Sequence, residues 1–187
     1  RAPNRENCGY CHFNGGGGNG VKHGDLDTSL IYPVANLDVH MGELNFLCTD
    51  CHRTSDHQIA GRSSSVSVDS ANQISCNDCH SSFPHEDERI NAHTQTVACQ
   101  TCHIPAMSLK DPTKIFWDWS TAGQDLPEDH YTYLKIKGSF IYEKNVRPTY
   151  LWYNETISYR YLLGDKIDPS NPVVMNPPAG SIDDPTA

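Results

Sequence analysis

The sequence has no stretch that approaches the roughly 20 consecutive apolar residues that a membrane-spanning helix requires. It also lacks a charged-then-apolar leader, because it opens with Arg1-Ala2-Pro3-Asn4. We therefore expect a soluble, processed or truncated product with no transmembrane segment. Apolar residues are scarce throughout, since only 37% of the 187 residues are hydrophobic while 13 are Gly and 12 are Pro. These apolar residues are too few for an ordinary hydrophobic core, so a bound apolar group must fill part of the interior.

Positive charge is also in short supply. The chain carries 14 Lys and Arg residues against 23 Asp and Glu residues, for a formal net charge of -9. A negative field of this size argues against nucleic acid as a partner and favours cationic or basic-patched proteins.

Cysteine, in contrast, is abundant and regularly spaced. Eight cysteines form four pairs with two residues between the members of each pair, and a histidine directly follows each pair. The pairs and their histidines are Cys8, Cys11 and His12; Cys48, Cys51 and His52; Cys76, Cys79 and His80; and Cys99, Cys102 and His103. This spacing is the attachment signature of c-type haem. Two thiols bond to the vinyl groups at one porphyrin edge, and the adjacent imidazole ligates the iron. The sequence therefore predicts four covalently bound haem c groups.

Paired cysteines have two other interpretations, a zinc site and a disulfide framework. Two Cys-x-x-Cys pairs make a common four-thiolate zinc site, and a secreted protein can use paired cysteines as a disulfide framework. Neither explains the histidine after every pair. With 10 histidines among 187 residues, four such coincidences have a probability on the order of one in a hundred thousand.

Six histidines outside the motifs are candidate distal ligands. They are His23, His40, His57, His85, His93 and His130. Four irons need at most four distal ligands, so every haem can be bis-histidine coordinated, and two imidazoles remain for polar roles or for a haem on another chain. His57 and His85 each follow a motif histidine by five residues. That separation is too short to reach round the same porphyrin, so we expect both to serve neighbouring haems.

Methionine is the rival distal ligand, represented by Met41, Met107 and Met175. It would raise the reduction potential relative to bis-imidazole iron. Because imidazoles are more numerous, we expect low-potential, six-coordinate haems. Such irons have no open position for a substrate, so the expectation is electron transfer, with no catalytic residue identifiable.

The short spacing between motifs leaves little room for packed elements. We expect a multihaem cytochrome c fold that is mostly irregular, with short α-helices around four haems. Strand-like patterns at 131–137, 139–142 and 149–153 predict a small antiparallel β region in the C-terminal third.

Composition also suggests three regions along the chain. Residues 1–110 form the expected tetrahaem-binding region, and 111–167 form an aromatic-rich region without cysteine. Residues 168–187 are expected to be an extended Pro-rich tail that wraps a neighbouring subunit or links to something further.

The text between the motifs resembles a known family. The segments that carry the resemblance are ENCGYCHFNGGGGNGVKHGDLD, LDVHMGELNFLCTDCHRTSDHQIAG, VACQTCHIP, PTKIFWDWSTAGQD and YLLGDKIDP. They resemble the second half of octahaem cytochromes of the tetrathionate reductase type, from about residue 6 to residue 170. The resemblance implies a periplasmic relative with eight haems, whose lysine-ligated catalytic haem lies in the half that precedes the matched part. It also implies distal roles for His23, His40, His57 and His93.

Two functions follow from these observations. The first is a tetrahaem cytochrome that passes electrons along closely packed haems, in one form as a polymerising extracellular wire subunit. The second is the electron-conducting half of an octahaem reductase acting on tetrathionate or nitrogen oxides. We favour the first, because the chain contains no identifiable catalytic haem.

The expected partners are other redox proteins or copies of the chain itself, meeting through haem-to-haem contact in a homo-oligomer or polymer. Covalent haem attachment takes place outside the cytoplasmic membrane, so we expect a periplasmic or extracellular location.

Overall fold

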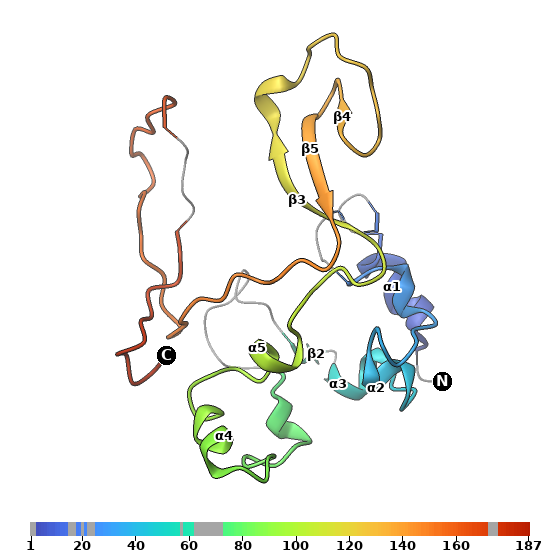
Figure 1. The fold of residues 1–187 in the computed structure, drawn as a ribbon, viewed down its shortest axis with the longest axis vertical. Coiled ribbons are helices and arrows are strands. Elements are labelled where there is room, and N and C mark those ends of the chain that lie inside the picture. Colours follow the sequence, from blue (N-terminus) through green and yellow to red (C-terminus); the bar gives the residue numbers. More distant parts are fainter. Residues whose placement is uncertain are drawn as a thin grey trace. The chain divides into compact units, whose positions relative to one another are not determined.

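The computed structural model describes residues 3–14, 18–19, 21, 25–56, 58–61, 73–171 and 176–187 (Figure 1). Its α-helices are short: α1 (Arg5–His12), α2 (Val39–Gly42), α3 (Cys48–Cys51), α4 (Glu88–His93) and α5 (Gln100–His103). Single 3-10 turns occur at η1 (Thr28–Leu30), η2 (Cys76–Asp78) and η3 (Trp119–Thr121). The strands are β1 (Thr54–Ser55), β2 (Gln58–Ile59), β3 (Thr113–Asp118), β4 (Tyr133–Leu134) and β5 (Gly138–Glu143). This confirms the predicted architecture, an irregular chain with short helices and small antiparallel sheets.

The chain divides into two compact units, and each is built from two segments that are distant in sequence. Unit 1 comprises Arg1–Ile59 and His103–Pro148. Unit 2 comprises Ala60–Cys102 and Thr149–Ala187. The helices of the described part are all too short or too polar to cross a membrane.

The polypeptide by itself builds very little hydrophobic core. Among the described residues, the buried hydrophobic side chains are Phe13, Tyr133 and Phe140. Large apolar side chains such as Tyr10 and Trp119 remain exposed. The shortage of apolar residues in the sequence is thus repeated in three dimensions, as expected if a bound group fills the interior.

The largest regular feature is the three-stranded antiparallel sheet of unit 1, with strand order β3-β5-β4. Gly138 begins β5 with a φ of 79°, and a Cβ there would lie 2.2 Å from the Asp118 carbonyl oxygen. Only glycine suits both that backbone conformation and that close approach. This position therefore sets how β5 enters the sheet beside β3.

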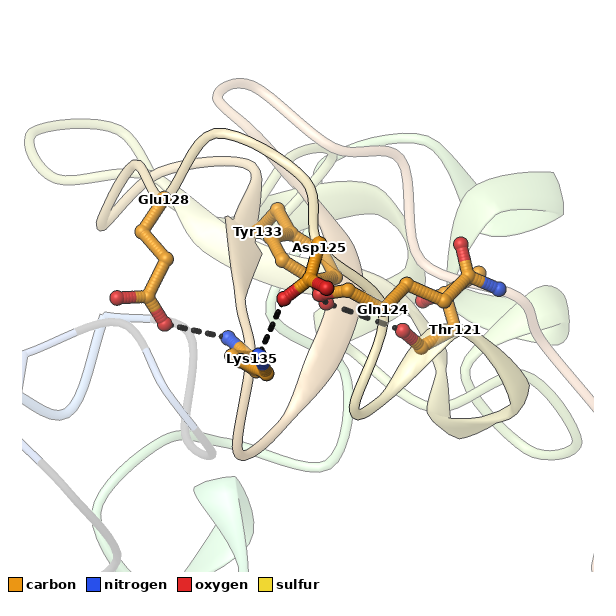
Figure 2. Close-up of polar contacts among 6 residues, drawn as sticks. All are labelled: Thr121, Gln124, Asp125, Glu128, Tyr133 and Lys135. Carbon is orange, nitrogen blue, oxygen red and sulfur yellow. Dashed lines mark hydrogen bonds and ion pairs between the residues drawn. The ribbon is translucent and has the colours of Figure 1, made fainter.

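Polar contacts tie the segment 121–128 to Tyr133 in β4 and to Lys135 just after it (Figure 2). The Tyr133 hydroxyl is 3.2 Å from the Thr121 carbonyl and 2.7 Å from the Gln124 carbonyl, to which it donates. Lys135 forms an ion pair with Asp125, and its backbone N–H donates to Glu128 Oε1 at 2.6 Å. Because Tyr133 is nearly fully buried, its hydroxyl needs these partners.

The strand predictions were partly right. The predicted strand at 139–142 lies within β5, but only Tyr133–Leu134 of 131–137 is a strand. The expected strand at 149–153 was wrong. The C-terminal tail runs beside an earlier irregular segment: Ser158 N–H donates to the Pro177 carbonyl at 2.9 Å, and Ala179 N–H donates to the Thr156 carbonyl at 3.0 Å. These are isolated contacts between irregular segments and form no ladder.

Strand β3 was not predicted from the sequence. Its register against β5 shifts between Lys114 and Phe116, which leaves Ile115 as the extra residue of a β-bulge. A bulge breaks the two-residue alternation on which strand prediction depends.

Candidate haem-attachment sites

Each Cys-x-x-Cys-His motif lies on a short helical turn. The first lies in the C-terminal part of α1, the second covers α3 and His52 after it, the third begins with η2, and the fourth ends with α5. A turn of this kind brings residues three and four positions apart close together. The two cysteines and the histidine of a motif are therefore near one another, which suits attachment to a single porphyrin edge and its iron.

Local hydrogen bonds hold these turns in shape. His52 N–H donates to the Cys48 carbonyl, and His80 N–H donates to the Cys76 carbonyl, each at 2.8 Å. Side chains cap the turns as well. Asn4 Oδ1 accepts from Asn7 N–H at 2.9 Å, and Ser75 Oγ accepts from Asn77 N–H at 3.2 Å. The motif geometry is thus encoded locally.

The thiols and imidazoles of the motifs are accessible to a group from outside the polypeptide. None of the eight cysteines is in a disulfide. The second cysteine of each motif is exposed, and so is each motif histidine. In the part of the chain that the structure describes, no three His, Cys, Asp or Glu side chains converge on a metal position. The cysteine pairs are therefore not arranged as four-thiolate zinc sites, and their residues fit haem c.

The first cysteines of successive motifs meet in pairs. In unit 1 the side chain of Cys8 lies near enough to Cys48 to affect its protonation, and in unit 2 that of Cys99 does the same to Cys76. Burial raises the pKa of the Cys48 thiol and Cys8 raises it further; burial and then Cys99 likewise raise the pKa of Cys76. The motifs are therefore grouped as one with two and three with four.

Sequence reasoning did not identify Arg5, which begins helix α1 three residues before Cys8. Its guanidinium is nearly fully buried, with 8% of the residue exposed. It donates to the Phe46 carbonyl at 3.1 Å and 2.8 Å and to the Met41 carbonyl at 2.7 Å. Since Phe46 lies two residues before Cys48, these bonds tie helix α1 to the approach to the second motif. A single arginine three residues before a motif gives no sequence signal for such a role.

The structure describes four of the six candidate distal histidines; His23 and His57 lie outside the described residues. His40 lies on α2, with its ring centroid 5.7 Å from that of Phe46. His93 ends α4, and its carbonyl accepts from Val97 N–H at 2.8 Å. The exposed His130 lies in the loop before β4. Each of these three imidazoles is surface-exposed.

His85 is held more firmly than the other described candidates. The nearly buried Asn91 accepts from His85 N–H at 2.9 Å through Oδ1 and donates to the His85 carbonyl at 2.6 Å through Nδ2. This two-point contact fixes the backbone of His85 against helix α4. Of the rival methionines, Met41 lies on α2, Met107 forms an isolated bridge to Val146, and Met175 is outside the described residues. The ligand assignments themselves stay predictions.

Comparisons with known proteins agree with this geometry. The family described as cytochrome c7 and related cytochrome c matches residues 34–106, and the family described as bacterial cytochrome c matches residues 114–187. No curated protein matches the chain.

A solved structure, the crystal structure of octaheme cytochrome c from Shewanella oneidensis, is similar to this chain at 48% identity with a TM-score of 0.86. The match covers 99% of this chain and 42% of that chain, so the present chain spans less than half the length of this relative. Cytochromes of the matched families carry covalently bound haem c. With the attachment turns, the irregular fold and these matches together, the chain belongs to the multihaem c-type cytochromes.

Proposed function

We propose that this chain is a tetrahaem electron-transfer protein, with one covalently bound haem c at each of its four motifs. The observation that carries the proposal is the placement of all four motifs at short helical turns with the second cysteine and the histidine exposed. Because Cys8 lies near Cys48 and Cys76 lies near Cys99, groups bonded to these sulfurs would be neighbours. When bound, haem supplies reversible one-electron chemistry at its iron.

The residues of the chain have separate roles in this proposal. In each motif the two sulfurs form the thioether bonds, and the adjacent histidine is the proximal ligand. The distal ligands come from His23, His40, His57, His85, His93 and His130. Histidine on both sides of each iron would leave no position for a substrate, which favours electron transfer over catalysis.

The negative charge of the protein favours some redox partners over others. With a net charge of -9, the protein attracts cationic or basic-patched redox partners, and salt weakens that attraction. Copies of the chain are the other proposed partners, in a homo-oligomer or an extracellular polymer. Because haem c is attached outside the cytoplasmic membrane, the proposed compartment is the periplasm or the cell exterior.

A second candidate function is favoured by one observation. The chain matches 42% of an octahaem cytochrome at 48% identity. It would then be the electron-conducting part of a larger octahaem reductase, with tetrathionate or nitrogen oxides as substrates.

Haem content and the spin state and ligands of the irons distinguish the two proposed functions. Pyridine haemochrome analysis with intact mass should give four haems per chain, and a protein with the mass of the bare chain would contradict both functions. Electron paramagnetic resonance of the oxidised protein should show low-spin irons. A substantial high-spin or lysine-ligated signal that responds to tetrathionate or nitrite would instead favour the reductase.

The assembly state tests the proposed polymer. Electron microscopy of the purified holoprotein should show filaments if end haems of neighbouring copies meet. A compact monomer or trimer at the same concentration would contradict the polymer. The electron-transfer function would still be tested by the haem content and the electron paramagnetic resonance spectra.

A further inference from the structure

Within the described residues, the Arg5 guanidinium donates only to neutral oxygen atoms. Besides its bonds to Phe46 and Met41, its guanidinium donates to the Ile31 carbonyl at 3.2 Å and to Asn45 Oδ1 at 3.1 Å. Three backbone carbonyls and one side-chain amide thus surround a buried cation. Carbonyl dipoles offset part of the loss of hydration, but they do not neutralise the charge.

No carboxylate neutralises Arg5 in the described part of the chain. The ion pair found there joins Lys135 and Asp125. Glu6, the adjacent acid on helix α1, accepts instead from the Tyr32 hydroxyl at 3.4 Å and from Asn4 Nδ2 at 3.5 Å. Buried charges are ordinarily paired, so an unneutralised guanidinium is costly unless it has a use.

The charge lies close to the paired motifs of unit 1. Arg5 begins the helix that carries Cys8, and its guanidinium lowers the pKa of the Cys48 thiol, opposing the larger effect of burial. Its field therefore reaches a sulfur that would be bonded to the cofactor.

We propose that Arg5 is a positioning residue with two effects on motifs one and two. Its hydrogen bonds hold helix α1 against the segment that leads into the second motif, and its charge raises the reduction potential of the haems bound there. An oxidised haem carries one more positive charge than a reduced haem, so a nearby cation disfavours the oxidised form. The inference rests on the proposed function in requiring haem at these motifs.

Charge and hydrogen bonding can be changed separately. Asn45 has a φ of 56°, a left-handed conformation that aspartate also tolerates, and its side chain contacts Arg5. Asn45→Asp keeps the hydrogen-bond acceptor and places a negative charge against the guanidinium. Asn145→Asp is the matched control, because Asn145 is exposed, has a φ of 53°, and does not contact Arg5.

The experiment begins with haem content, measured by pyridine haemochrome and intact mass on the full holoprotein. A wild-type protein without haem would overturn the proposed function, whatever the variants do. If haem is present in wild type and Asn45→Asp, a potentiometric titration followed by visible and electron paramagnetic resonance spectra tests Arg5.

We expect Asn45→Asp to shift part of the titration to more negative potential, with the remaining haems and the Asn145→Asp control unchanged. Equal shifts in reduction potential in Asn45→Asp and Asn145→Asp, or no shift in either, would overturn the proposed effect of the Arg5 charge on the haem potentials.

A second pair of variants tests the hydrogen bonds. Arg5→Lys keeps the charge, whereas Arg5→Gln removes it, and both lose most of the bonds to Phe46 and Met41. We expect both to unfold at lower temperature, with the negative shift in potential confined to Arg5→Gln. Arg89→Gln, at an exposed arginine early in α4, is the control for stability. Melting temperatures as high as wild type in both Arg5 variants would overturn the positioning role. The same shift in reduction potential in both variants would overturn the proposed effect of the charge.

Discussion

Lys114 and Trp117 lie on the same face of the unit 1 sheet, although three positions separate them along β3. The cause is the bulge at Ile115, which lets Lys114 pair with Tyr142 and Trp117 pair with Phe140. The Lys114 ammonium then lies 3.7 Å from the Trp117 ring centroid, 4.2 Å from that of Phe140 and 5.3 Å from that of Tyr142. Without the extra residue, the lysine and the tryptophan would be on opposite faces.

The pH dependence of the free energy of unfolding tests how the folded environment changes the pKa of Lys114. Burial, and then the charge of Lys137, lowers the pKa of the Lys114 amine from 10.5. Between the lowered value and 10.5, the unfolded chain binds more protons at this site than the folded chain. This contribution to the free energy of unfolding is therefore absent below the lowered pKa and grows as the pH rises through the interval.

We expect Lys114→Met to remove this rise. Denaturant titrations at a series of pH values up to about pH 10.5 would measure how the free energy of unfolding of both proteins changes with pH. Lys144→Met, at an exposed lysine after β5, should keep the wild-type slope. An unchanged slope in Lys114→Met would show that the sheet does not alter the proton affinity of Lys114.

Two glycines with similar backbone conformations offer a matched test of the sheet. At Gly138, with a φ of 79°, an added Cβ would meet the Asp118 carbonyl, whereas at Gly123, with a φ of 84°, it would enter open space. Gly123→Ala should cost only the left-handed strain, about 1 kcal/mol. Gly138→Ala adds a backbone clash and should cost about 3 kcal/mol or more. Thermal unfolding of the two variants compares them, and equal losses would contradict the close approach.

Asp25 joins two distant segments of unit 1. Its two carboxylate oxygens accept from the backbone N–H groups of Ser108 and Leu109, each at 2.8 Å. Ser108 is fully buried and has a φ of 63°, so its conformation depends on this contact. Asp25→Asn keeps one acceptor oxygen and should lower the free energy of unfolding by about 1 to 2 kcal/mol. Denaturant unfolding measures the loss, and the same loss in Asp183→Asn, at an exposed aspartate, would argue against a specific contact.

The motif cysteines give the most direct test of haem attachment. Cys76→Ala removes one thioether bond at motif three and a sulfur that lies near Cys99. We expect weaker attachment of one haem and local unfolding of unit 2. Intact mass and pyridine haemochrome under denaturing conditions measure the haem that stays bound. Thr101→Ala changes a residue between the cysteines of motif four and should keep the full content; unchanged content in Cys76→Ala would mean that this site is wrongly assigned.

Some of the fold could be predicted because its causes are local. Two thiols and an imidazole within five residues need only one helical turn, and caps such as Asn4 and Ser75 lie beside their turns. The shortage of apolar residues likewise predicts an irregular chain with little core. The β3 strand was missed because the Ile115 bulge disrupts its pattern, and 149–153 was misassigned because a β-rich composition alone does not supply a partner strand.

The class of cofactor could be predicted from the sequence, because covalent attachment of haem c depends on five consecutive residues. The proximity of Cys8 to Cys48 and of Cys76 to Cys99, and the burial of Arg5, became visible in the folded chain. Those relationships join residues tens of positions apart. They depend on which segments pack together, and no local spacing records that choice.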